Sequence, residues 1–335
     1  MTKHTVKQAD AQLRINDEAR QAPYLTAVEY TLVNQTRLAG TVLLSASQDA
    51  ATPNAATQDA ATQDADRKKI VLCLHGYLDN SHSFIPMLQQ LAVNEYTNRQ
   101  VIALDFAGHG QSGHRSADAH YHPSDYTQDI VSLIEAQDWQ DVILVGHSMG
   151  GMIGCSVAAL LPERITQLIL VETAGALTAE SDTTVSQLRT SITSRINAAQ
   201  KQPKQPSHYQ AVLTARMQVS DISLAHADLI MRNNLRFATE QPSIKDACTW
   251  GTDSRLRTIS TCRFLPEQVR NIVQHIIAPV TMLIGDAGFE RVKEQANERI
   301  AWFNQLSIIE TPGNHYLHMQ YPQVLSDMIT GLSDS

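Results

Sequence analysis

The sequence has few cysteines and few basic residues, and both shortages exclude classes of protein. The four cysteines, Cys73, Cys155, Cys248 and Cys262, are far apart and show no C-x-x-C spacing. Free thiols in a reducing compartment are therefore expected rather than a disulfide framework or a cysteine-rich zinc site. Lysine and arginine number 26 against 34 aspartate and glutamate residues, a formal net charge of -8. No excess positive charge is available for a phosphate backbone, so no nucleic-acid partner is predicted.

Long apolar runs are also missing. No run approaches the about 18 consecutive apolar residues of a membrane helix, and the N-terminal stretch holds nothing typical of a signal peptide. Hydrophobic residues make up 43% of the chain and charged residues 18%, which is typical of a globular domain with a sizeable core. We therefore predict a cytoplasmic protein without a membrane partner.

Short apolar runs alternate with helical patterns along most of the chain. Residues 27–33 and 36–45 are strand-like and flank an Asn-Gln turn. The apolar runs KKIVLCL, QVIALDF, DVILVG and QLILVET follow, separated by helical segments. This alternation predicts βαβ units and a mostly parallel sheet that is buried on both faces by helices.

Two segments interrupt the sheet pattern. Residues 46–66 repeat an Ala-Thr-Gln-Asp-Ala unit without large apolar side chains, which predicts a disordered insert loop, because too little surface is available to offset the ordering entropy. From 174 to 265 the sequence becomes helical and polar before strand patterns return. We therefore predict a core domain from residues 1–173 and 266–335, and an inserted helical cap from residues 174–265.

The motif GHSMG at residues 146–150 is the strongest functional signal. It directly follows the apolar strand 142–145 and opens a helical pattern. Glycines on both sides of Ser148 permit the sharp turn that lifts a serine hydroxyl above a parallel sheet, the nucleophile elbow of α/β-hydrolases. The alternative is that Ser148 is only a helix N-cap. Its position after a buried strand favours a nucleophile.

An acyl-transfer site also needs backbone N–H groups that face the developing oxyanion. The N–H of Met149, the residue after the nucleophile, supplies one such donor. The strand IVLCL ends at His75-Gly76-Tyr77, which places the N–H of Tyr77 to supply another. The imidazole of His75 is predicted to brace this turn and to take no part in the chemistry.

The base is expected late in the chain, because α/β-hydrolases carry nucleophile, acid and histidine in that order. His315 lies just beyond the late strand 306–311, in the turn-rich loop TPGNH. His114, His120 and His122 have a spacing that suggests a metal, but no cysteines accompany them and the nearby acids are scattered. We therefore predict His315 as the base, with no metal and no organic cofactor.

The acid that orients this histidine has two candidates. Asp286 ends the strand VTMLIG, and Glu172 ends the strand QLILV one strand after the nucleophile. In many α/β-hydrolases the acid stands three residues beyond the glycine that ends the first of these strands, but Gly288 occupies that position here. Asp286 either rotates into the role or caps the following helix. The adjacent strand favours Glu172, and both residues remain candidates.

With these residues the chain resembles the serine hydrolase-like proteins, a branch of the α/β-hydrolase superfamily. The resemblance covers nearly the whole chain and rests on LCLHGYLDNSHSF (72–84), ALDFAGHGQSGH (103–114), YHPSDYTQDI (121–130), VGHSMGG (145–151), TWGTDSRLR (249–257) and TPGNHYLHMQYP (311–322). It implies an α/β-hydrolase fold, with a mostly parallel central sheet flanked by helices and an inserted helical cap. It defines the catalytic residues more sharply than the substrate.

These observations predict a serine hydrolase, specifically a carboxylesterase acting on small to medium acyl esters. His315 takes the proton of Ser148, and a small-molecule ester is the expected partner. Tyr77, Phe84 and Trp250 are predicted to contact the substrate. The alternatives are a perhydrolase or C–C bond hydrolase with the same triad, and a non-catalytic hydrolase fold that binds a ligand.

Three further polar residues are expected around the site. Asp79, in the stretch HGYLDN, is predicted to hold loop backbone rather than to act on a substrate. Arg255 and Arg257 lie in the cap, where each either pairs with an acid or meets an anionic substrate. The sequence gives no prediction for the oligomeric state.

Overall fold

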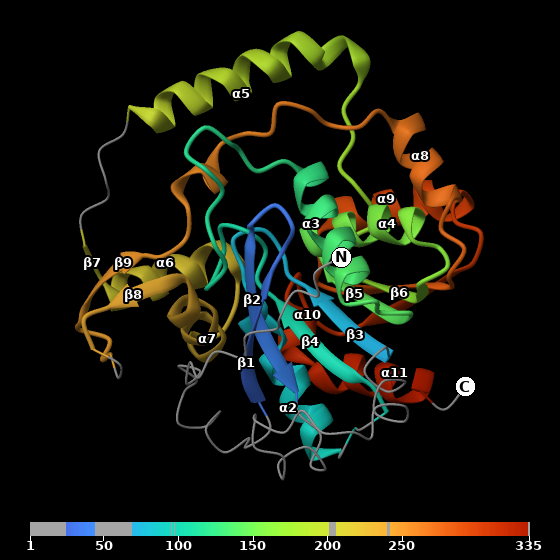
Figure 1. The fold of residues 1–335 in the computed structure, drawn as a ribbon, viewed down its shortest axis with the longest axis horizontal. Coiled ribbons are helices and arrows are strands. Elements are labelled where there is room, and N and C mark those ends of the chain that lie inside the picture. Colours follow the sequence, from blue (N-terminus) through green and yellow to red (C-terminus); the bar gives the residue numbers. More distant parts are fainter. Residues whose placement is uncertain are drawn as a thin grey trace.

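An eight-stranded sheet forms the centre of the molecule (Figure 1). The computed structural model describes residues 25–43, 69–94, 96, 98–200, 206–239 and 242–333, so the predicted insert loop 46–66 lies outside the described residues. The strands are β1 (Leu25–Thr31), β2 (Arg37–Leu43), β3 (Lys69–Leu74), β4 (Gln100–Leu104), β5 (Asp141–His147), β6 (Ile165–Val171), β10 (Val280–Gly285) and β11 (Leu306–Thr311). Their order across the sheet is β1-β2-β4-β3-β5-β6-β10-β11.

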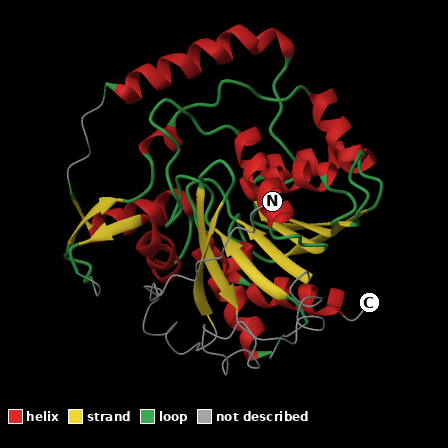
Figure 2. Cartoon of the chain, viewed as in Figure 1, coloured by secondary structure: helices red, strands yellow, loops and turns green. Residues whose placement is uncertain are grey.

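Most neighbouring strands of this sheet are parallel. β1 pairs antiparallel with β2, and β2 pairs antiparallel with β4, whereas the strands from β4 to β11 pair in parallel. Parallel strands require crossover connections, and helices provide them on both faces (Figure 2). The predicted fold class, a mostly parallel sheet flanked by helices, is confirmed.

Two apolar layers cover the sheet. On one face, Leu72 and Leu74 of β3 belong to a core cluster with side chains of three flanking helices, α3 (Pro123–Ala136), α4 (Met149–Leu160) and α8 (Pro266–Gln274). On the other face, Val71 and Cys73 belong to a cluster with α2 (Ile85–Val93) and α11 (Pro322–Ser333). Alternate residues of β3 thus face opposite layers, which is why this strand is apolar throughout.

The segment predicted as a helical cap contains helices and a small sheet. Its helices are α5 (Thr184–Ala199), α6 (Tyr209–Ser220) and α7 (Leu224–Asn234). Its strands are β7 (Ser207–His208), β8 (Leu235–Phe237) and β9 (Ala247–Trp250), which form an antiparallel sheet in the order β7-β9-β8. The prediction of a helical insert did not include this small sheet, because strands of two to four residues carry too little periodicity to be recognised.

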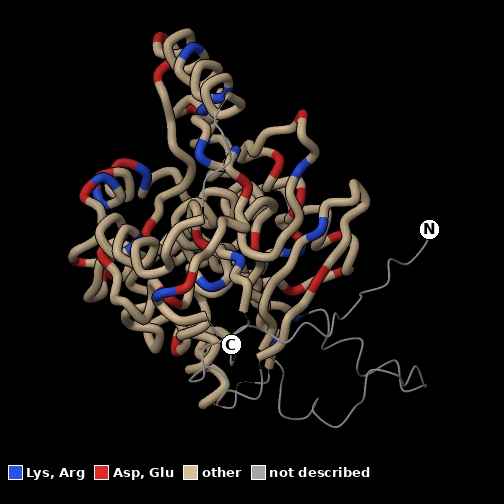
Figure 3. The backbone as a smooth tube through the Cα atoms, turned by 90° about the vertical axis from the view of Figure 1, so that its left-hand side faces the viewer, with Lys and Arg blue, Asp and Glu red and all other residues tan. Residues whose placement is uncertain are grey.

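The inserted elements surround one side of the sheet. Figure 1 shows α5 as a long helix at the upper edge of the view, apart from the sheet, while α6, α7 and the small sheet lie at its left. Acidic and basic positions are interspersed along the backbone tube in Figure 3, and neither sign is confined to one part of it. Among the described helices, none combines the length and apolarity needed to cross a membrane.

Candidate active site

Ser148 stands at the sharp turn between β5 and α4. Its backbone has φ 50° and ψ -114°, a strained conformation for a residue with a side chain. The turn is tight, since a Cβ at Gly150 would lie 2.0 Å from the carbonyl oxygen of Leu74. Although Ser148 occupies the N-cap position of α4, its side chain forms no capping hydrogen bond. The turn thus has the geometry of a nucleophile elbow, and the hydroxyl is not used as a cap.

His315 contacts Glu172. The His315 Nδ1 atom lies 3.2 Å from Glu172 Oε2, and the Glu172 side chain is completely buried. Two backbone N–H groups also donate to this carboxylate, that of Gly285 to Oε1 at 2.7 Å and that of Phe289 to Oε2 at 3.3 Å. Glu172 itself has φ 53°, a second strained backbone position close to Ser148 in the sheet. The Glu172 carboxylate is therefore fixed by its own hydrogen bonds in contact with the His315 imidazole.

The loop after β10 leaves room for this carboxylate. A Cβ at Gly288 would lie 2.3 Å from Glu172 Oε1, so Glu172 occupies the space into which a side chain at position 288 would project. Asp286, the other candidate, has a different partner, because its Oδ1 accepts a hydrogen bond from the Gly313 N–H at 2.9 Å. Asp286 thereby fixes the loop before His315, and Glu172 is the residue in contact with the ring.

Phe289 is a neighbour of His315 that the sequence did not reveal. Its ring stacks on the imidazole, with centroids 4.2 Å apart and an angle of 23° between the planes. Phe289 precedes α9 (Glu290–Arg299) and is 58% exposed, so it covers one face of the imidazole from the solvent side. The sequence offered no signal for this contact beyond the position of Phe289 next to Gly288.

The loop that carries Tyr77 is held by His75. The Phe106 N–H donates to His75 Nε2 at 3.0 Å, so the proton of the neutral ring lies on Nδ1, which donates to the Gly76 carbonyl at 2.7 Å. Burial lowers the pKa of His75 to about 4. This loop approaches the start of α4, because a Cβ at Gly150, the second residue of that helix, would lie 2.8 Å from the His75 carbonyl oxygen.

The three predicted substrate contacts have different surroundings. Tyr77 is 49% exposed, and its hydroxyl donates to the Leu256 carbonyl at 2.8 Å. Trp250 ends β9 and lies under the Arg257 guanidinium, 4.5 Å from the ring centroid. Phe84 is completely buried in the core cluster against α2. The prediction that Phe84 contacts a substrate is therefore corrected, because the side chain packs into the core instead of a surface.

A buried polar network lies beneath the loops of Tyr77 and His315. Arg216 of α6 donates to Asp79 Oδ1 and also, at 2.8 Å, to the Tyr316 hydroxyl. Asp79 is completely buried, and burial raises the pKa of its carboxyl while Arg216 opposes this effect. His147 Nε2 bonds the His315 carbonyl at 2.9 Å. Asp79 thus pairs with side chains rather than with loop backbone as predicted, and its partners Arg216 and Tyr316 were not anticipated.

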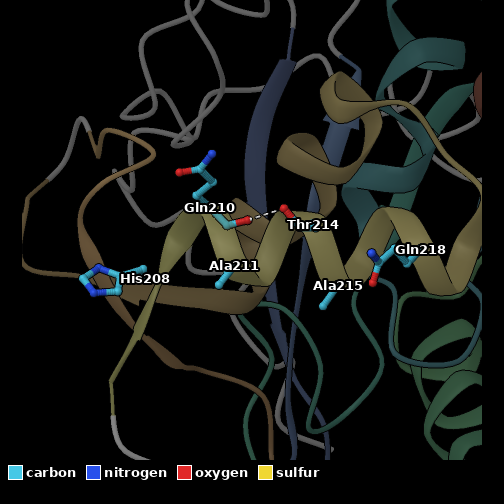
Figure 4. A pocket seen from close by; sticks show the side chains of 6 residues that line it. All are labelled: His208, Gln210, Ala211, Thr214, Ala215 and Gln218. Atoms are coloured by element: carbon cyan, nitrogen blue, oxygen red, sulfur yellow. Dashed lines mark hydrogen bonds between the residues drawn. The ribbon is translucent and has the colours of Figure 1, made fainter.

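Two other features do not form part of this site. His114 Nε2 bonds the Gly251 carbonyl at 3.0 Å, and across the described part of the chain no three His, Cys, Asp or Glu side chains are arranged to hold a metal ion. The pocket in Figure 4 lies along α6 and contains neither Ser148 nor His315. Its lining residues are His208, Gln210, Ala211, Thr214, Ala215 and Gln218.

The buried histidines predict that the protein loses stability in mild acid. Burial lowers the pKa of His318 to about 3, with a smaller contribution from the charge of His315. An unfolded histidine titrates near about 6.5, so acidification below that pH protonates the unfolded state first and favours it until the folded pKa is reached. For His318→Leu, the loss of unfolding free energy between pH 6.5 and 4 should be shallower by up to about 1.4 kcal/mol per pH unit.

Urea unfolding at a series of pH values measures these slopes. His275→Gln is the matched control, because the exposed His275 side chain follows α8 and bonds the Asn271 carbonyl at 2.7 Å, and this variant should keep the wild-type slope. Equal slopes for His318→Leu and the wild type would contradict the assignment of a neutral, buried imidazole to His318.

The chain is similar to curated proteins and to solved structures over most of its length. A family model described as the alpha/beta hydrolase fold matches residues 69–330. The serine hydrolase-like protein of Danio rerio is 27% identical over 271 residues, 78% of this chain and 80% of the relative. Serine hydrolase-like protein 2 of Homo sapiens is 26% identical over 278 residues, 78% and 85% of the two chains. A hypothetical protein from Pseudomonas aeruginosa PAO1 has a TM-score of 0.75 at 26% identity, with 92% of this chain and 99% of that chain covered.

Proposed function

Because the chain belongs to the α/β-hydrolase fold family, we propose that it is a serine hydrolase that cleaves carboxylic esters of small to medium acyl chain length through an acyl-enzyme on Ser148. The observation that carries this proposal is the contact of 3.2 Å between His315 Nδ1 and Glu172 Oε2, late in a chain whose Ser148 stands on a strained elbow. Nucleophile, acid and histidine then follow one another in the order expected for this fold.

In the proposed mechanism, Glu172 fixes the tautomer of His315. A hydrogen bond from Nδ1–H to the carboxylate leaves Nε2 free to accept the proton of the Ser148 hydroxyl. The serine oxygen attacks the ester carbonyl, and the N–H groups of Met149 and Tyr77 stabilise the oxyanion. His315 returns the proton to the leaving alcohol, and a water molecule then hydrolyses the acyl-enzyme by the same route.

Contacts to Glu172 and to His315 support a site in which the acid and the histidine already have the orientation that this chemistry needs. The backbone N–H groups of Gly285 and Phe289 hold the Glu172 carboxylate, so little rearrangement is needed when positive charge develops on the imidazole. The Phe289 ring restricts rotation of His315 by stacking on it. An orienting acid with its own hydrogen bonds supports the precise geometry that general base catalysis requires.

A perhydrolase or C–C bond hydrolase with the same three residues is the alternative within enzymes, and a substrate panel separates it from an esterase. A non-catalytic fold that binds a ligand is the alternative outside enzymes. The strained backbone at Ser148 favours a catalytic protein, because such strain costs about 1–3 kcal/mol and persists where function requires it.

Replacing Ser148 by alanine tests the proposed nucleophile. The wild type should hydrolyse p-nitrophenyl esters, and Ser148→Ala should lower kcat by at least about 10⁴-fold, because the acyl-enzyme cannot form. Ser156→Ala, on the same helix α4, is the matched control and should retain activity. A folded wild-type protein that neither turns over esters nor reacts with a fluorophosphonate would favour the ligand-binding alternative.

A further inference from the structure

We propose that Arg257, together with Trp250 and Tyr77, forms an anion-binding subsite, so that the preferred substrate carries a negatively charged group, such as a carboxylate, remote from the scissile ester. This inference rests on the proposed esterase function and specifies its substrate class. It starts from two cap arginines that the sequence could not distinguish, Arg255 and Arg257.

Arg255 has a structural role. Its Nη2 lies 2.6 Å from Asp253 Oδ2, and its guanidinium also donates to three backbone carbonyl groups at 2.6 to 2.7 Å. These carbonyl groups belong to Ser116, Ala119 and Arg115. The guanidinium of Arg255 therefore fastens the segment before α3 to the cap and offers little to a ligand.

Arg257 has no comparable anionic partner. Its guanidinium stacks over the Trp250 ring at 4.5 Å, and among the described residues no aspartate or glutamate forms an ion pair with it. The neighbouring cap arginine Arg216 is neutralised by Asp79. A guanidinium that is oriented by an aromatic face and lacks a carboxylate is suited to bidentate binding of a ligand carboxylate.

The position of Arg257 connects this charge to the reaction centre. The Tyr77 hydroxyl donates to the carbonyl of Leu256, the residue before Arg257, so the Tyr77 side chain spans from the proposed oxyanion donor to the cap. Burial raises the pKa of Tyr77, and the positive charge of Arg257 opposes this effect. An acyl chain that starts at Ser148 and follows Tyr77 therefore leads towards Arg257.

The neighbours of Arg257 leave its charge unbalanced. Arg216 interacts electrostatically with Arg257 but is itself paired with Asp79, and burial lowers the pKa of the nearby His109 to about 3, so that this imidazole is neutral. A carboxylate at the end of a short acyl chain is the ligand that these groups complement. The chemical class is a half-ester of a dicarboxylic acid, or another ester with an acidic group at the far end of its acyl chain.

A pair of esters with the same acyl length tests the subsite. Mono-p-nitrophenyl adipate carries a terminal carboxylate, and p-nitrophenyl hexanoate does not. The wild type should prefer the adipate in kcat/KM, and Arg257→Gln should reduce this preference by about 10-fold or more, since a charge-assisted hydrogen bond is lost. Arg257→Lys should retain part of it. Arg263→Gln, an exposed arginine of the same insert, is the matched control and should keep the wild-type ratio.

The outcomes separate the subsite from the esterase activity. Equal kcat/KM for both esters in the wild type, or an equal ratio in wild type and Arg257→Gln, would overturn the subsite and leave the esterase intact. Absence of turnover with either ester would count against the esterase instead. In that case, calorimetric titration of Ser148→Ala with monomethyl adipate still tests the subsite. Binding that is weakened by adding Arg257→Gln would support the subsite, and undetectable binding would overturn it.

Discussion

Replacing Glu172 by glutamine is expected to lower kcat for ester hydrolysis by about 10⁴-fold, because an amide cannot hold the imidazole in the tautomer that accepts the serine proton. The side chain keeps nearly the same volume, so the loss reports on the carboxylate itself. Asp286→Asn is the matched control. Its amide oxygen can still accept the hydrogen bond from the Gly313 N–H that Asp286 now accepts at 2.9 Å, and kcat should change by less than about 10-fold.

Steady-state kinetics with one p-nitrophenyl ester measures both variants, and thermal unfolding shows that each is folded. A large loss in Asp286→Asn with a small loss in Glu172→Gln would reverse the assignment of the acid. Equal, small losses in both would mean that a different residue orients His315.

The acid can also be moved from position 172 to position 288 by a pair of substitutions. Gly288→Asp alone should abolish activity, because its Cβ would lie 2.3 Å from Glu172 Oε1. Glu172→Gly removes this collision and suits the local φ of 53°. The double variant Glu172→Gly/Gly288→Asp should therefore recover activity relative to either single variant. No recovery in a folded double variant would show that the loop after β10 cannot present a carboxylate to His315.

The sheet and the elbow were predictable from sequence because their signals are local. An apolar strand followed by GHSMG requires only neighbouring residues to be recognised, and the structure gives Ser148 the strained turn that this motif demands. The choice between Glu172 and Asp286 was only partly local. Gly288 indicated that the usual position lacked an acid, but the space it leaves for Glu172 depends on the pairing of β6 with β10.

The missed residues depend on contacts between distant segments. Phe289 and Tyr316 look like ordinary apolar positions in sequence, and their roles follow from the approach of the loops after β10 and β11. Arg216 lies in a helix whose pattern gives no sign that it reaches Asp79, which is 137 positions earlier. The strands of the cap were missed for a different reason, since β7, β8 and β9 have only two to four residues each.

Breaking the Asp79–Arg216 ion pair should lower the free energy of unfolding more than any other single substitution proposed for this protein. Asp79 is completely buried, so removing its partner leaves an uncompensated charge in the core, which costs about 3–5 kcal/mol. Arg216→Met keeps much of the side-chain volume and should lower the free energy of unfolding by this amount. Arg37→Met, which breaks the exposed pair with Glu29, is the control and should cost less than about 1 kcal/mol.

A double variant distinguishes a lost charge partner from lost packing. In Asp79→Leu/Arg216→Met both charges are replaced by apolar groups, which is often neutral or stabilising for a buried pair, so most of the stability lost in Arg216→Met should return. Urea unfolding of the four proteins of this cycle gives the coupling energy. A double variant as unstable as the sum of the single variants would show that the pair contributes by packing alone.

The same pair links three parts of the molecule that the proposed chemistry needs together. Asp79 follows the loop of Tyr77, Arg216 belongs to α6, and the Tyr316 hydroxyl, which accepts from Arg216 at 2.8 Å, is adjacent to His315. Asn314 adds a second tie, because its Nδ2 donates to the Asp221 carbonyl at the end of α6 at 2.6 Å. Arg216→Met should therefore lower kcat of the remaining folded protein, whereas the double variant, which restores stability, should not restore kcat. Recovery of both properties together would assign this network to stability alone.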